Sequence, residues 1–392
     1  MHSDRTQVAI IGAGPAGLLL QQLLRLGGVE SVVLERQTRA HVEARIRAGV
    51  LEPGTVALLE KAGVAGRLHR EGLVHEGVEL AVDGRRFRID LRELTGDCVT
   101  VYGQTEITHD LFAAADAHLS PIVYEAEHVL LHDLDGERPY VTWEKHGVDH
   151  RIDCDHVAGC DGQHGASRAA LPTGVTHLFE RHGSAAWLGV LADVPPCAPE
   201  LIYAESPRGF ALASMRSSTR SRYYLQVDAH DALEDWPEAR FWEELARRLG
   251  PDAAAHLTPD YALERSIVPL RSHVIEPMQW GRLFLAGDAA HVVPPTGAKG
   301  LNLAAADVGL LADALIAWHK GGGASLLATY SGRALARAWK AVRFSWWFTG
   351  LTHRAAGADP FDLQLQRAEL DQLRTSRAAQ TLFAENYVGR FA

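Results

Sequence analysis

The stretch Val8-Ala9-Ile10-Ile11-Gly12-Ala13-Gly14-Pro15-Ala16-Gly17 decides the fold of this chain. Its four apolar residues predict a buried strand, and Leu18 to Leu26 continue as a helix after the Gly-x-Gly-x-x-Gly turn. In such a unit Gly12 permits the tight turn, Gly14 lets a pyrophosphate approach the backbone, and Gly17 lets the helix pack closely on the strand. The helix N-terminus then points at the phosphates. The stretch therefore predicts a dinucleotide-binding unit.

A second strand supports this interpretation over a purely structural glycine turn. Ser31-Val32-Val33-Leu34-Glu35 ends in an acid about 20 residues after the turn, where it can accept a hydrogen bond from a ribose hydroxyl. Arg45 and Arg47 follow at a two-residue spacing, which places both on one side of an extended segment. We expect them to bind cofactor phosphate rather than to form only a solvated basic surface.

Composition narrows the class of protein. The chain has 392 residues, 47% of them hydrophobic and 22% charged, which is typical of a globular protein with more than one domain. A net charge of -10 and the lack of a long basic run argue against a nucleic-acid partner. We read no export signal and no membrane span, and the four cysteines and 20 histidines form no metal-binding motif. A cytoplasmic protein without a metal or membrane partner is expected.

A second glycine stretch lies nearly 300 positions further on. Leu283 to Ala286 predict a buried strand that delivers Gly287-Asp288, and Pro294-Pro295 form a rigid turn before a helix expected to start at Gly297. The positive end of that helix would stabilise a reduced isoalloxazine ring, and Asp288 could bind the ribityl chain. Together the two stretches predict one FAD. Gly159-Cys160-Asp161-Gly162, after another predicted strand, adds a carboxylate in a flexible backbone setting.

The intervening chain predicts strands and the tail predicts helices. Val78 to Leu91 reads as a hairpin with its turn at Asp83-Gly84, and strands recur from Trp187 to Val227 as an antiparallel sheet inserted into the nucleotide domain. Thr105 is a candidate cap for a helix that runs to His118. Phe344 to Phe348 predicts helix packing or a subunit contact. Further helices are expected at 55–68, 235–249, 301–320, 326–352 and 361–383.

These residues resemble the single-component flavin aromatic hydroxylases over essentially the whole chain, and most closely the members that act on 4-hydroxybenzoate. The resemblance implies an α/β fold with a GR2-type FAD-binding Rossmann-like domain, an inserted antiparallel β-sheet substrate domain and a C-terminal helical region. The stretches that carry it are Val8 to Gly17, Arg45 to Glu52, Val101 to Glu106, Gly159 to Gly162, Glu200 to Tyr224, Leu270 to Asn302, Phe344 to Trp347 and Glu385 to Gly389. The expected domains are 1–180 for FAD with an excursion near 73–100 into the substrate sheet, 181–268 for substrate, 269–300 for FAD again, and 301–392 for the helical region.

The resemblance also implies roles for individual residues. Ser214, Arg216 and Tyr224 match those that hold the aromatic carboxylate, and Arg suits this because its planar fork pairs both oxygens. Tyr203 matches the residue that hydrogen-bonds the phenol, with Tyr387 and His75 continuing a proton path; without the resemblance each tyrosine would simply be a buried aromatic. The flavin side would be lined by Pro295, Thr296, Ala298 and Arg222. The cofactor would be held by Gly12, Gly14, Gly17, Glu35, Arg45, Arg47, Gln104, Asp161, Asp288, Pro295, Gly300, Leu301 and Asn302.

The implied reaction transfers oxygen from a flavin C4a-hydroperoxide to an electron-rich phenolate ring, with NADPH or NADH as electron donor and O2 as oxidant. No second complete glycine-rich unit exists, so the donor would bind in a surface groove formed by Arg36, Gln37, Arg45, His164 and Arg271. NADPH is the preferred expectation, although His41 and Arg39 differ from the pattern of NADPH-dependent members. Two alternatives stay open: a hydroxylase for a related benzoate, and a non-catalytic binding protein on the same fold. A homodimer is expected.

Overall fold

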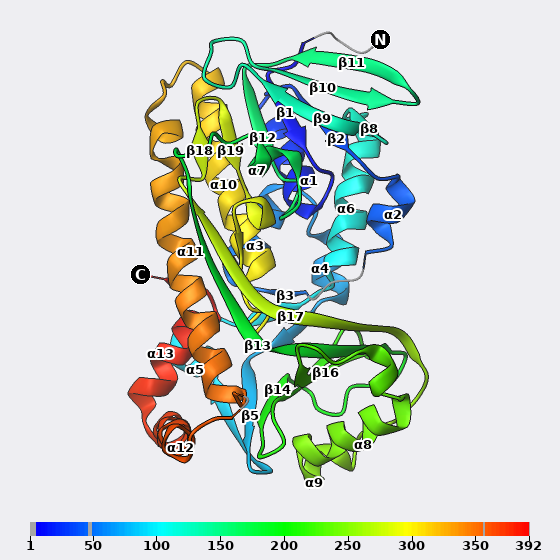
Figure 1. Ribbon diagram of the computed structural model, residues 1–392, viewed down its shortest axis with the longest axis vertical. Helices are drawn as coiled ribbons and strands as arrows, with labels where there is room; N and C mark the ends of the chain where they lie inside the picture. The colour runs from blue at the N-terminus through cyan, green and yellow to red at the C-terminus, as the bar shows by residue number, and fades with distance from the viewer. Residues whose placement is uncertain (1–4, 46–48, 356, 392) are drawn as a thin grey trace.

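The computed structural model describes residues 5–45, 49–355 and 357–391, arranged around two large sheets (Figure 1). The first sheet has the strand order β18-β19-β12-β1-β2-β8, in which only β18 runs antiparallel to its neighbour. Its strands are β1 (Val8–Ile11), β2 (Ser31–Glu35), β8 (Ile122–Tyr124), β12 (His156–Gly159), β18 (Gln279–Trp280) and β19 (Leu283–Leu285). The predicted strands at Val8, Ser31 and Leu283 are thus confirmed as one parallel nucleotide-binding sheet.

Helices cover this sheet because their apolar residues recur with helical spacing. Helix α1 (Pro15–Leu26) packs against both α6 (Gln104–Ala117) and α10 (Gly300–His319). Helix α10 is long and apolar enough to cross a membrane, but more than half of its most apolar window is buried inside the protein. Its composition is therefore explained by its place in the core.

The second sheet is antiparallel apart from one parallel pair, β14 with β5, and has the order β20-β17-β13-β16-β15-β14-β5-β6. Its strands are β5 (Gly77–Val82), β6 (Arg85–Asp90), β13 (His177–Ala192), β14 (Ile202–Glu205), β15 (Ala211–Met215), β16 (Ser221–Asp228), β17 (Ala262–Glu276) and β20 (His291–Val292). The predicted fold class, an inserted antiparallel sheet next to a Rossmann-like sheet, is confirmed.

Two long strands join the two parts of the molecule. Strands β13 and β17 of the second sheet pair along almost their whole length, and one end of the pair reaches up beside the first sheet (Figure 1). The expected divisions at 181 and 269 fall inside these strands, so the proposed domain limits remain predictions. Two small sheets complete the strands: β9 (Glu127–His132) with β10 (Tyr140–Lys145) and β11 (Val148–Asp153), and β3 (Val50–Leu51) with β4 (Leu73–His75) and β7 (Val99–Val101).

The two faces of the second sheet have different partners because successive side chains point to opposite sides. One face carries residues such as Ile202, Ala213 and Tyr223 and packs on α8 (Glu238–Leu249). The other face carries Trp187, Tyr203, Leu212 and their neighbours and packs on α11 (Ser325–Thr352) and α13 (Arg377–Tyr387). The polar residues proposed for substrate are on this second face.

Four local predictions were wrong, each for a backbone reason. The helix expected from Gly297 starts at Gly300, because Gly297 and Ala298 have φ angles of 82° and 53° that a right-handed helix excludes. The helix expected over 361–383 is split into α12 (Pro360–Thr375) and α13 at Ser376, whose extended backbone and hydroxyl cap α13. Thr105 does not cap α6, since Gly103 holds that position and the Thr105 hydroxyl donates to the Arg45 carbonyl.

The remaining helices are short. The segment expected as one helix over 55–68 is divided into α3 and α4 by Gly63, at a φ of 73°. The rings of Phe344 and Phe348 are fully buried between the sheet and α13, so this part of the aromatic group belongs to the core. The short helices are α2 (Arg39–Glu43), α3 (Pro53–Lys61), α4 (Gly66–Glu71), α5 (Leu91–Thr95), α7 (Ala166–Ala169) and α9 (Pro251–Ala254).

Candidate active site

The two glycine stretches meet at the carboxyl edge of the first sheet. Strand β12 lies between β1 and β19, and its last residue Gly159 pairs with both Ile11 and Leu285. The Gly12 turn, Asp161 and the Gly287 turn therefore emerge side by side. A methyl group on Gly287 would lie 3.7 Å from Cβ of Ala16 at the start of α1. Ligands of open parallel sheets bind at this edge, outside the carboxyl ends of the strands.

Three glycines of the first turn pass a test of fit for a pyrophosphate. A methyl group on Gly12 would lie 2.6 Å from the carbonyl oxygen of Cys160, and one on Gly17 would lie 2.0 Å from that of Gly12. Both positions need glycine for close packing. Beside Gly14, apart from its chain neighbours, no heavy atom of the described residues lies within 4 Å of such a methyl group, so the backbone there is open to a ligand. These are the separate tasks that the sequence assigned to the three glycines.

Glu35 is fixed beside this turn. Its carboxylate accepts hydrogen bonds from the backbone N–H groups of Ala13 and Gln37, both at 2.8 Å. A carboxylate has about four lone-pair sites, so capacity remains for a ribose hydroxyl. The position at the end of β2, next to the turn, suits that role.

Asp161 offers an acceptor that the protein leaves unused. Its Oδ2 accepts from the Ser167 backbone N–H at 2.9 Å, whereas Oδ1 is buried and has no partner among the described residues. Burial raises the pKa of Asp161, which shows how costly this uncompensated charge is. A hydroxyl-bearing ligand would supply the missing donor.

Asp288 is exposed on the 3-10 turn η2 (Gly287–Ala289). The buried side chains of Asp307 and His291 hold that turn in place. Asp307 accepts from the Gly287 backbone N–H at 3.0 Å and lies 2.6 Å from Nε2 of His291. Burial disfavours the His291 cation, but the facing carboxylate outweighs it and raises the pKa of His291. The turn that presents Asp288 is thereby fixed from inside.

The side chain of Asn302, a predicted cofactor residue, is hydrogen-bonded within the protein. Its Oδ1 accepts from the Glu52 N–H and the Thr55 hydroxyl, and its Nδ2 donates to the carbonyls of Val50 and Ala298. All four hydrogen-bonding positions of the amide are used within the protein. Only backbone N–H groups of Gly300, Leu301 and Asn302, in the first turn of α10, remain as donors to a ligand.

The other predicted cofactor residues are less constrained. Arg45 is exposed, and Gln104 is the first residue of α6. Arg47 lies outside the described residues. The phosphate role of the two arginines therefore stays a prediction.

The predicted substrate residues lie on one face of the second sheet. Tyr203 on β14 pairs with Leu212 on β15, which pairs with Tyr224 on β16, and Ser214 pairs with Arg222. Paired residues on adjacent strands point to the same side, so these four polar side chains share a face. The sequence placed them in one sheet, and the register brings them together.

Arg216 lies at the end of β15 with an incomplete set of partners. Its Nη1 donates to the Ser214 hydroxyl at 3.3 Å and to the Met215 carbonyl at 2.9 Å, while its buried Nε has no partner. Burial lowers the pKa of Arg216, and the tyrosine hydroxyl of Tyr224 partly offsets this. No carboxylate is hydrogen-bonded to this guanidinium among the described side chains. A buried cation of this kind is stabilised by an anionic ligand.

Arg222, unlike Arg216, has its guanidinium bound by side chains of β17. Its Nη1 pairs with Glu264 at 3.0 Å and its Nη2 donates to the Ser266 hydroxyl at 3.0 Å. Its partners fix the guanidinium over the edge of the Tyr224 ring, 5.3 Å from the ring centre.

Two tyrosines from distant segments form a hydrogen-bonded pair. The hydroxyls of Tyr203 and Tyr387 are 3.1 Å apart and both side chains are fully buried. Burial raises the pKa of Tyr203 to about 12, against the opposing effect of the hydrogen bond from Tyr387. Burial likewise raises the pKa of Tyr387. Both phenols are therefore neutral near pH 7 and can each donate and accept a proton.

His75 lies on β4 and is not hydrogen-bonded to either tyrosine of this pair. It is 2% exposed, and neither ring nitrogen has a hydrogen-bond partner among the described residues. Burial lowers the pKa of His75 to about 4, despite the nearby Glu200 carboxylate. The hydrogen-bonded part of the predicted path therefore joins Tyr203 to Tyr387, and its extension to His75 stays a prediction.

The loop before α10 packs against α11. Thr296 is fully buried, and its hydroxyl lies 2.8 Å from that of Thr349. A methyl group on Gly297 would lie 2.8 Å from the ring of Phe344. Pro295, Thr296 and Ala298 are therefore held in a fixed loop between the two sheets.

Comparison with known proteins places the chain in a family. A model of the FAD binding domain family matches residues 5–345. The chain belongs to this family. It is 52% identical over 390 residues to p-hydroxybenzoate hydroxylase of Acinetobacter baylyi, covering 99% of this chain and 96% of that one. It is also 27% identical to 6-methylpretetramide 4-monooxygenase of Streptomyces rimosus, over 77% of this chain and 73% of that one.

Solved structures show the same fold. p-Nitrophenol 4-monooxygenase of Pseudomonas putida superposes with a TM-score of 0.82 at 20% identity, covering 99% of both chains. Aklavinone-11 hydroxylase, solved with FAD and aklavinone, gives 0.75 at 22% identity over 90% of this chain and 70% of that one. The protein is a FAD-dependent aromatic hydroxylase, as its resemblance to this group implied.

The predicted NAD(P)H residues of this flavoprotein lie on three separate segments. Arg36 and Gln37 directly follow β2, His164 precedes α7, and Arg271 is on β17. Arg36, His164 and Arg45 are exposed, as a surface groove requires. Helix α7 and β17 are joined where Nη1 of Arg168 lies 3.1 Å from Nε2 of His273, close in sequence to His164 and Arg271. The groove itself stays a prediction.

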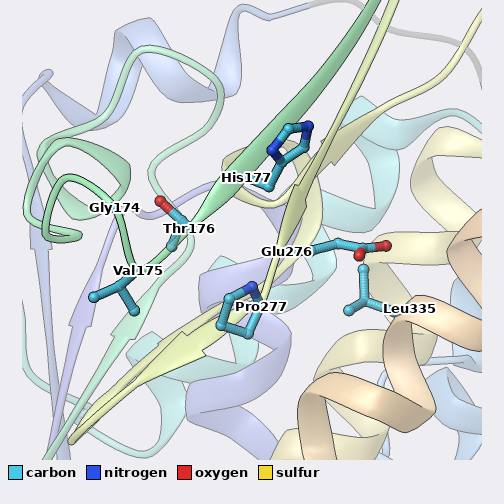
Figure 2. Close-up of a pocket in the computed structure, with 7 residues that line it drawn as sticks. All are labelled: Gly174, Val175, Thr176, His177, Glu276, Pro277 and Leu335. Carbon is cyan, nitrogen blue, oxygen red and sulfur yellow. The ribbon is translucent and has the colours of Figure 1, made fainter.

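One cleft of the flavoprotein lies away from these residues. It has a volume of about 590 Å³ and lies between the start of β13, the end of β17 and α11 (Figure 2). Its walls are formed by Gly174, Val175, Thr176, His177, Glu276, Pro277 and Leu335. None of the predicted cofactor or substrate residues is among them, so we do not assign it to the active site.

Sequence reasoning missed several residues that shape the site. Trp187 shares the face of Tyr203 and Tyr224, and the strand alternation around Gly189 contained that signal. Lys299 is buried, with Nζ 2.8 Å from Glu52 and 2.7 Å from the Tyr387 carbonyl. A lysine inside a loop gave no sequence signal of burial. His353, at the end of α11, was equally unmarked.

Proposed function

We propose that this hydroxylase converts 4-hydroxybenzoate, NADPH, a proton and O2 to 3,4-dihydroxybenzoate, NADP+ and water. The observation that carries the proposal is the shared face of the second sheet, which presents a half-buried arginine and a tyrosine pair. An aromatic acid with a phenol satisfies both. The 52% identical relative is called p-hydroxybenzoate hydroxylase, which supports the same substrate.

Arg216, Ser214 and Tyr224 would bind the carboxylate. The guanidinium supplies charge and donors in one plane, which the Tyr224 hydroxyl supplements. The Ser214 hydroxyl donates to the Arg222 carbonyl at 3.0 Å and would have to turn away from it to donate to the ligand. Because Tyr203 and Tyr224 are two strands apart on the same row, a ligand held at its carboxylate would extend along the sheet face toward Tyr203. A ring carrying its phenol opposite the carboxylate fits this order.

Tyr203 and Tyr387 would remove the phenolic proton. Ring hydroxylation requires an electron-rich ring, and a phenolate is far richer than a phenol. Tyr203 would accept the proton from the substrate as it passes its own to Tyr387, so neither tyrosine has to ionise. His75, with its lowered pKa, would pass the proton on rather than hold it.

The cofactor residues fit FAD by the tests above. Gly12, Gly14 and Gly17 would receive the pyrophosphate, Glu35 the ribose, and Asp161 and Asp288 hydroxyls further along the molecule. Pro295 and the first N–H groups of α10 would face the ring system. When bound, FAD supplies the two-electron chemistry and the activation of O2. Arg36, Gln37, Arg45, His164 and Arg271 would bind the NADPH.

Oxygen uptake and product identification test the proposal. Purified protein with FAD and 4-hydroxybenzoate should consume NADPH and O2 in equal amounts and yield 3,4-dihydroxybenzoate. The measurement is repeated with NADH, and with 3-hydroxybenzoate and 4-aminobenzoate as matched rings. NADPH oxidation without dihydroxybenzoate would defeat the proposal, and faster turnover of another ring would reassign the substrate.

We further infer a cytoplasmic homodimer, in which the groove and the pocket belong to each subunit. The buried rings of Phe344 and Phe348 do not supply a subunit contact, so the dimer rests on the family resemblance alone. Light scattering of the purified protein measures its mass directly. A monomer at micromolar concentration would remove this part of the proposal.

A further inference from the structure

The end of α11 contacts both sides of the proposed pocket. Thr349 lies in its last turn and His353 directly follows it, and both are buried. We propose that His353 is a positioning residue for the hydroxylation, because it fixes the indole of Trp187, which forms the aromatic wall behind Tyr224. The inference rests on the proposed function and adds to it a specificity element that lies outside direct contact with the predicted ligand.

The hydrogen-bond network assigns the tautomer of His353. Its Nδ1 lies 3.1 Å from the Thr349 carbonyl, which can only accept, so Nδ1 carries the proton. The Thr352 hydroxyl, 3.0 Å from the same nitrogen, already donates to the Phe348 carbonyl at 2.8 Å. Nε2 is therefore unprotonated and carries a lone pair that can accept a hydrogen bond. It accepts from Nε1–H of Trp187 at 2.6 Å.

The imidazole of His353 stays neutral near pH 7, with its proton on Nδ1. Burial lowers the pKa of His353 to about 3, with the Arg248 cation acting in the same direction and the Thr349 carbonyl opposing both. The ring also stacks on Phe210, with centres 4.2 Å apart and planes within 18°. His353 is thus held in position, in orientation and in tautomer.

Trp187 transmits this geometry to the pocket. Its ring centre is 4.9 Å from that of Tyr224 and 5.0 Å from that of Phe210. Tyr224 in turn lies beside Arg216. Burial lowers the pKa of Arg216, and the Tyr224 hydroxyl opposes that effect. Turning the indole about its side-chain bonds would leave its buried N–H without an acceptor and would free the Tyr224 ring to shift. The acceptor at His353 therefore fixes one wall of the carboxylate site.

The same turn is anchored to the loop that carries Pro295 and Thr296. The Thr349 hydroxyl donates its one proton either to the Thr296 hydroxyl at 2.8 Å or to the Ser345 carbonyl at 2.7 Å. Arg354, next to His353, donates to the Ser206 carbonyl at 2.9 Å and pairs with Glu205 at 3.0 Å. The wall behind Tyr224 is thereby placed at a set distance from the flavin-side loop.

Substitution of His353 tests the inference on the FAD-loaded enzyme. In His353→Phe the stacking on Phe210 is kept and the acceptor is lost, so we expect the Kd for 4-hydroxybenzoate to rise about tenfold. The fraction of NADPH oxidation that yields product should also fall, because a displaced ring is hydroxylated less often. In His353→Gln the side-chain oxygen can accept from Trp187, and Kd should stay within about threefold of the wild type.

Two comparisons separate positioning from general destabilisation. His156→Phe replaces another buried histidine, which packs edge-on against Trp318 in the first sheet, and it should leave Kd unchanged. Trp187→Phe should raise Kd as His353→Phe does, and the double variant should be no worse than either, because both remove one interaction. If His353→Phe does not fold, the Kd values of Trp187→Phe and His353→Gln test the inference: it requires a raised Kd in the first variant and a Kd near that of the wild type in the second.

Three results would overturn the inference: a wild-type Kd in His353→Phe, an equal rise in His156→Phe, or additive effects in the double variant. Failure of the proposed function is a different result. In that case the wild-type enzyme itself would not bind 4-hydroxybenzoate.

Discussion

At the scale of single residues, the neutral state of the tyrosine pair decides how the substrate phenol loses its proton. Tyr203→Phe removes the hydroxyl that faces both the predicted phenol and Tyr387. We expect the rate of hydroxylation to fall about 100-fold, the usual size of a general acid–base effect. Reduction of the flavin by NADPH should be unaffected, so peroxide should replace the hydroxylated product.

Stopped-flow absorbance and a peroxide assay measure the two steps of that variant separately. Tyr223→Phe is a matched control, because Tyr223 lies on the opposite face of the same sheet, against α8. Product yield unchanged in Tyr203→Phe would contradict the proton path. Equal losses in both variants would show only that the sheet had been disturbed.

A second prediction concerns the carboxylate. Arg216→Ala should raise the KM for 4-hydroxybenzoate between about 10-fold and 100-fold, since hydrogen bonds to charged groups contribute about 1.5–3 kcal/mol. The maximal rate should change much less, because the arginine binds substrate and transition state alike. Arg216→Lys keeps the charge without the planar fork and should be intermediate.

Steady-state kinetics over a range of substrate concentrations distinguish these cases. Arg220→Ala is the control, because that exposed arginine pairs with Asp193 at the surface. An unchanged KM in Arg216→Ala would show that the carboxylate binds elsewhere.

Residue types were predictable where one physical requirement dominates. Gly12 and Gly17 were correctly read because close packing admits no side chain there. The contacts of His353 and Lys299 were not predictable, because their partners lie 166 and 247 positions away and nothing in either segment signals burial. Asn302 illustrates a third case: its cofactor role stays a prediction, and its side-chain amide makes all of its hydrogen bonds within the protein.

At the scale of elements, the first glycine turn separates folding from cofactor binding. Gly14 has φ −71° and ψ 177°, which alanine adopts without strain, and in the part of the chain that the structure describes only its chain neighbours lie within 4 Å of an added methyl group. Gly14→Ala should therefore keep the stability of the apoprotein and lose FAD. Gly17→Ala places a methyl group 2.0 Å from a backbone oxygen and should destabilise the apoprotein itself by about 3 kcal/mol or more.

Urea unfolding of both apoproteins, with titration by FAD, measures the two effects independently. Gly54→Ala provides a control glycine with open surroundings outside the turn. Tight FAD binding by Gly14→Ala would show that the pyrophosphate does not approach this backbone.

The elements themselves were largely predictable, and their ends were not. The strands at β1, β2 and β19 followed from short apolar runs that end in glycine or an acid. The start of α10 was misplaced by three residues because the positive φ angles of Gly297 and Ala298 depend on packing against Phe344 and the following Lys299. Ala298 carries no sequence signal for such a conformation.

At the scale of the whole molecule, buried histidines make its stability depend on pH. Burial lowers the pKa of His75 to about 4 and the pKa values of His156 and His353 to about 3. Below the ordinary histidine pKa near 6.5, the unfolded chain binds protons at these three sites that the folded protein does not. Stability therefore falls as the pH drops from 6.5 toward 4, by up to about 1.4 kcal/mol per pH unit for each fully buried site.

Two buried carboxyl groups oppose this effect. Burial raises the pKa of Asp161 and of Glu205, so the folded protein gains protons at these sites before the unfolded chain does. Their contribution is confined to pH values above about 4, where carboxyl groups of the unfolded chain are still ionised. His291 opposes the effect as well, because the facing Asp307 carboxylate outweighs burial and raises the pKa of His291. Burial also lowers the pKa of His273 to about 4 and lowers that of His319, so five histidines against these three groups leave a net loss of stability in acid.

Urea unfolding at pH 7.0, 6.0 and 5.0 measures the dependence, with circular dichroism as the probe. We expect the midpoint to decrease at each step for the wild-type protein. The decrease should be smaller in His156→Phe, because this variant lacks one of the histidines that bind protons only on unfolding. The variant itself should be less stable than the wild-type protein. The difference between the two decreases in urea midpoint gives the contribution of His156 alone, at a position outside the proposed pocket. A midpoint that stays constant from pH 7.0 to 5.0 would mean that the buried imidazoles find proton partners in the folded protein.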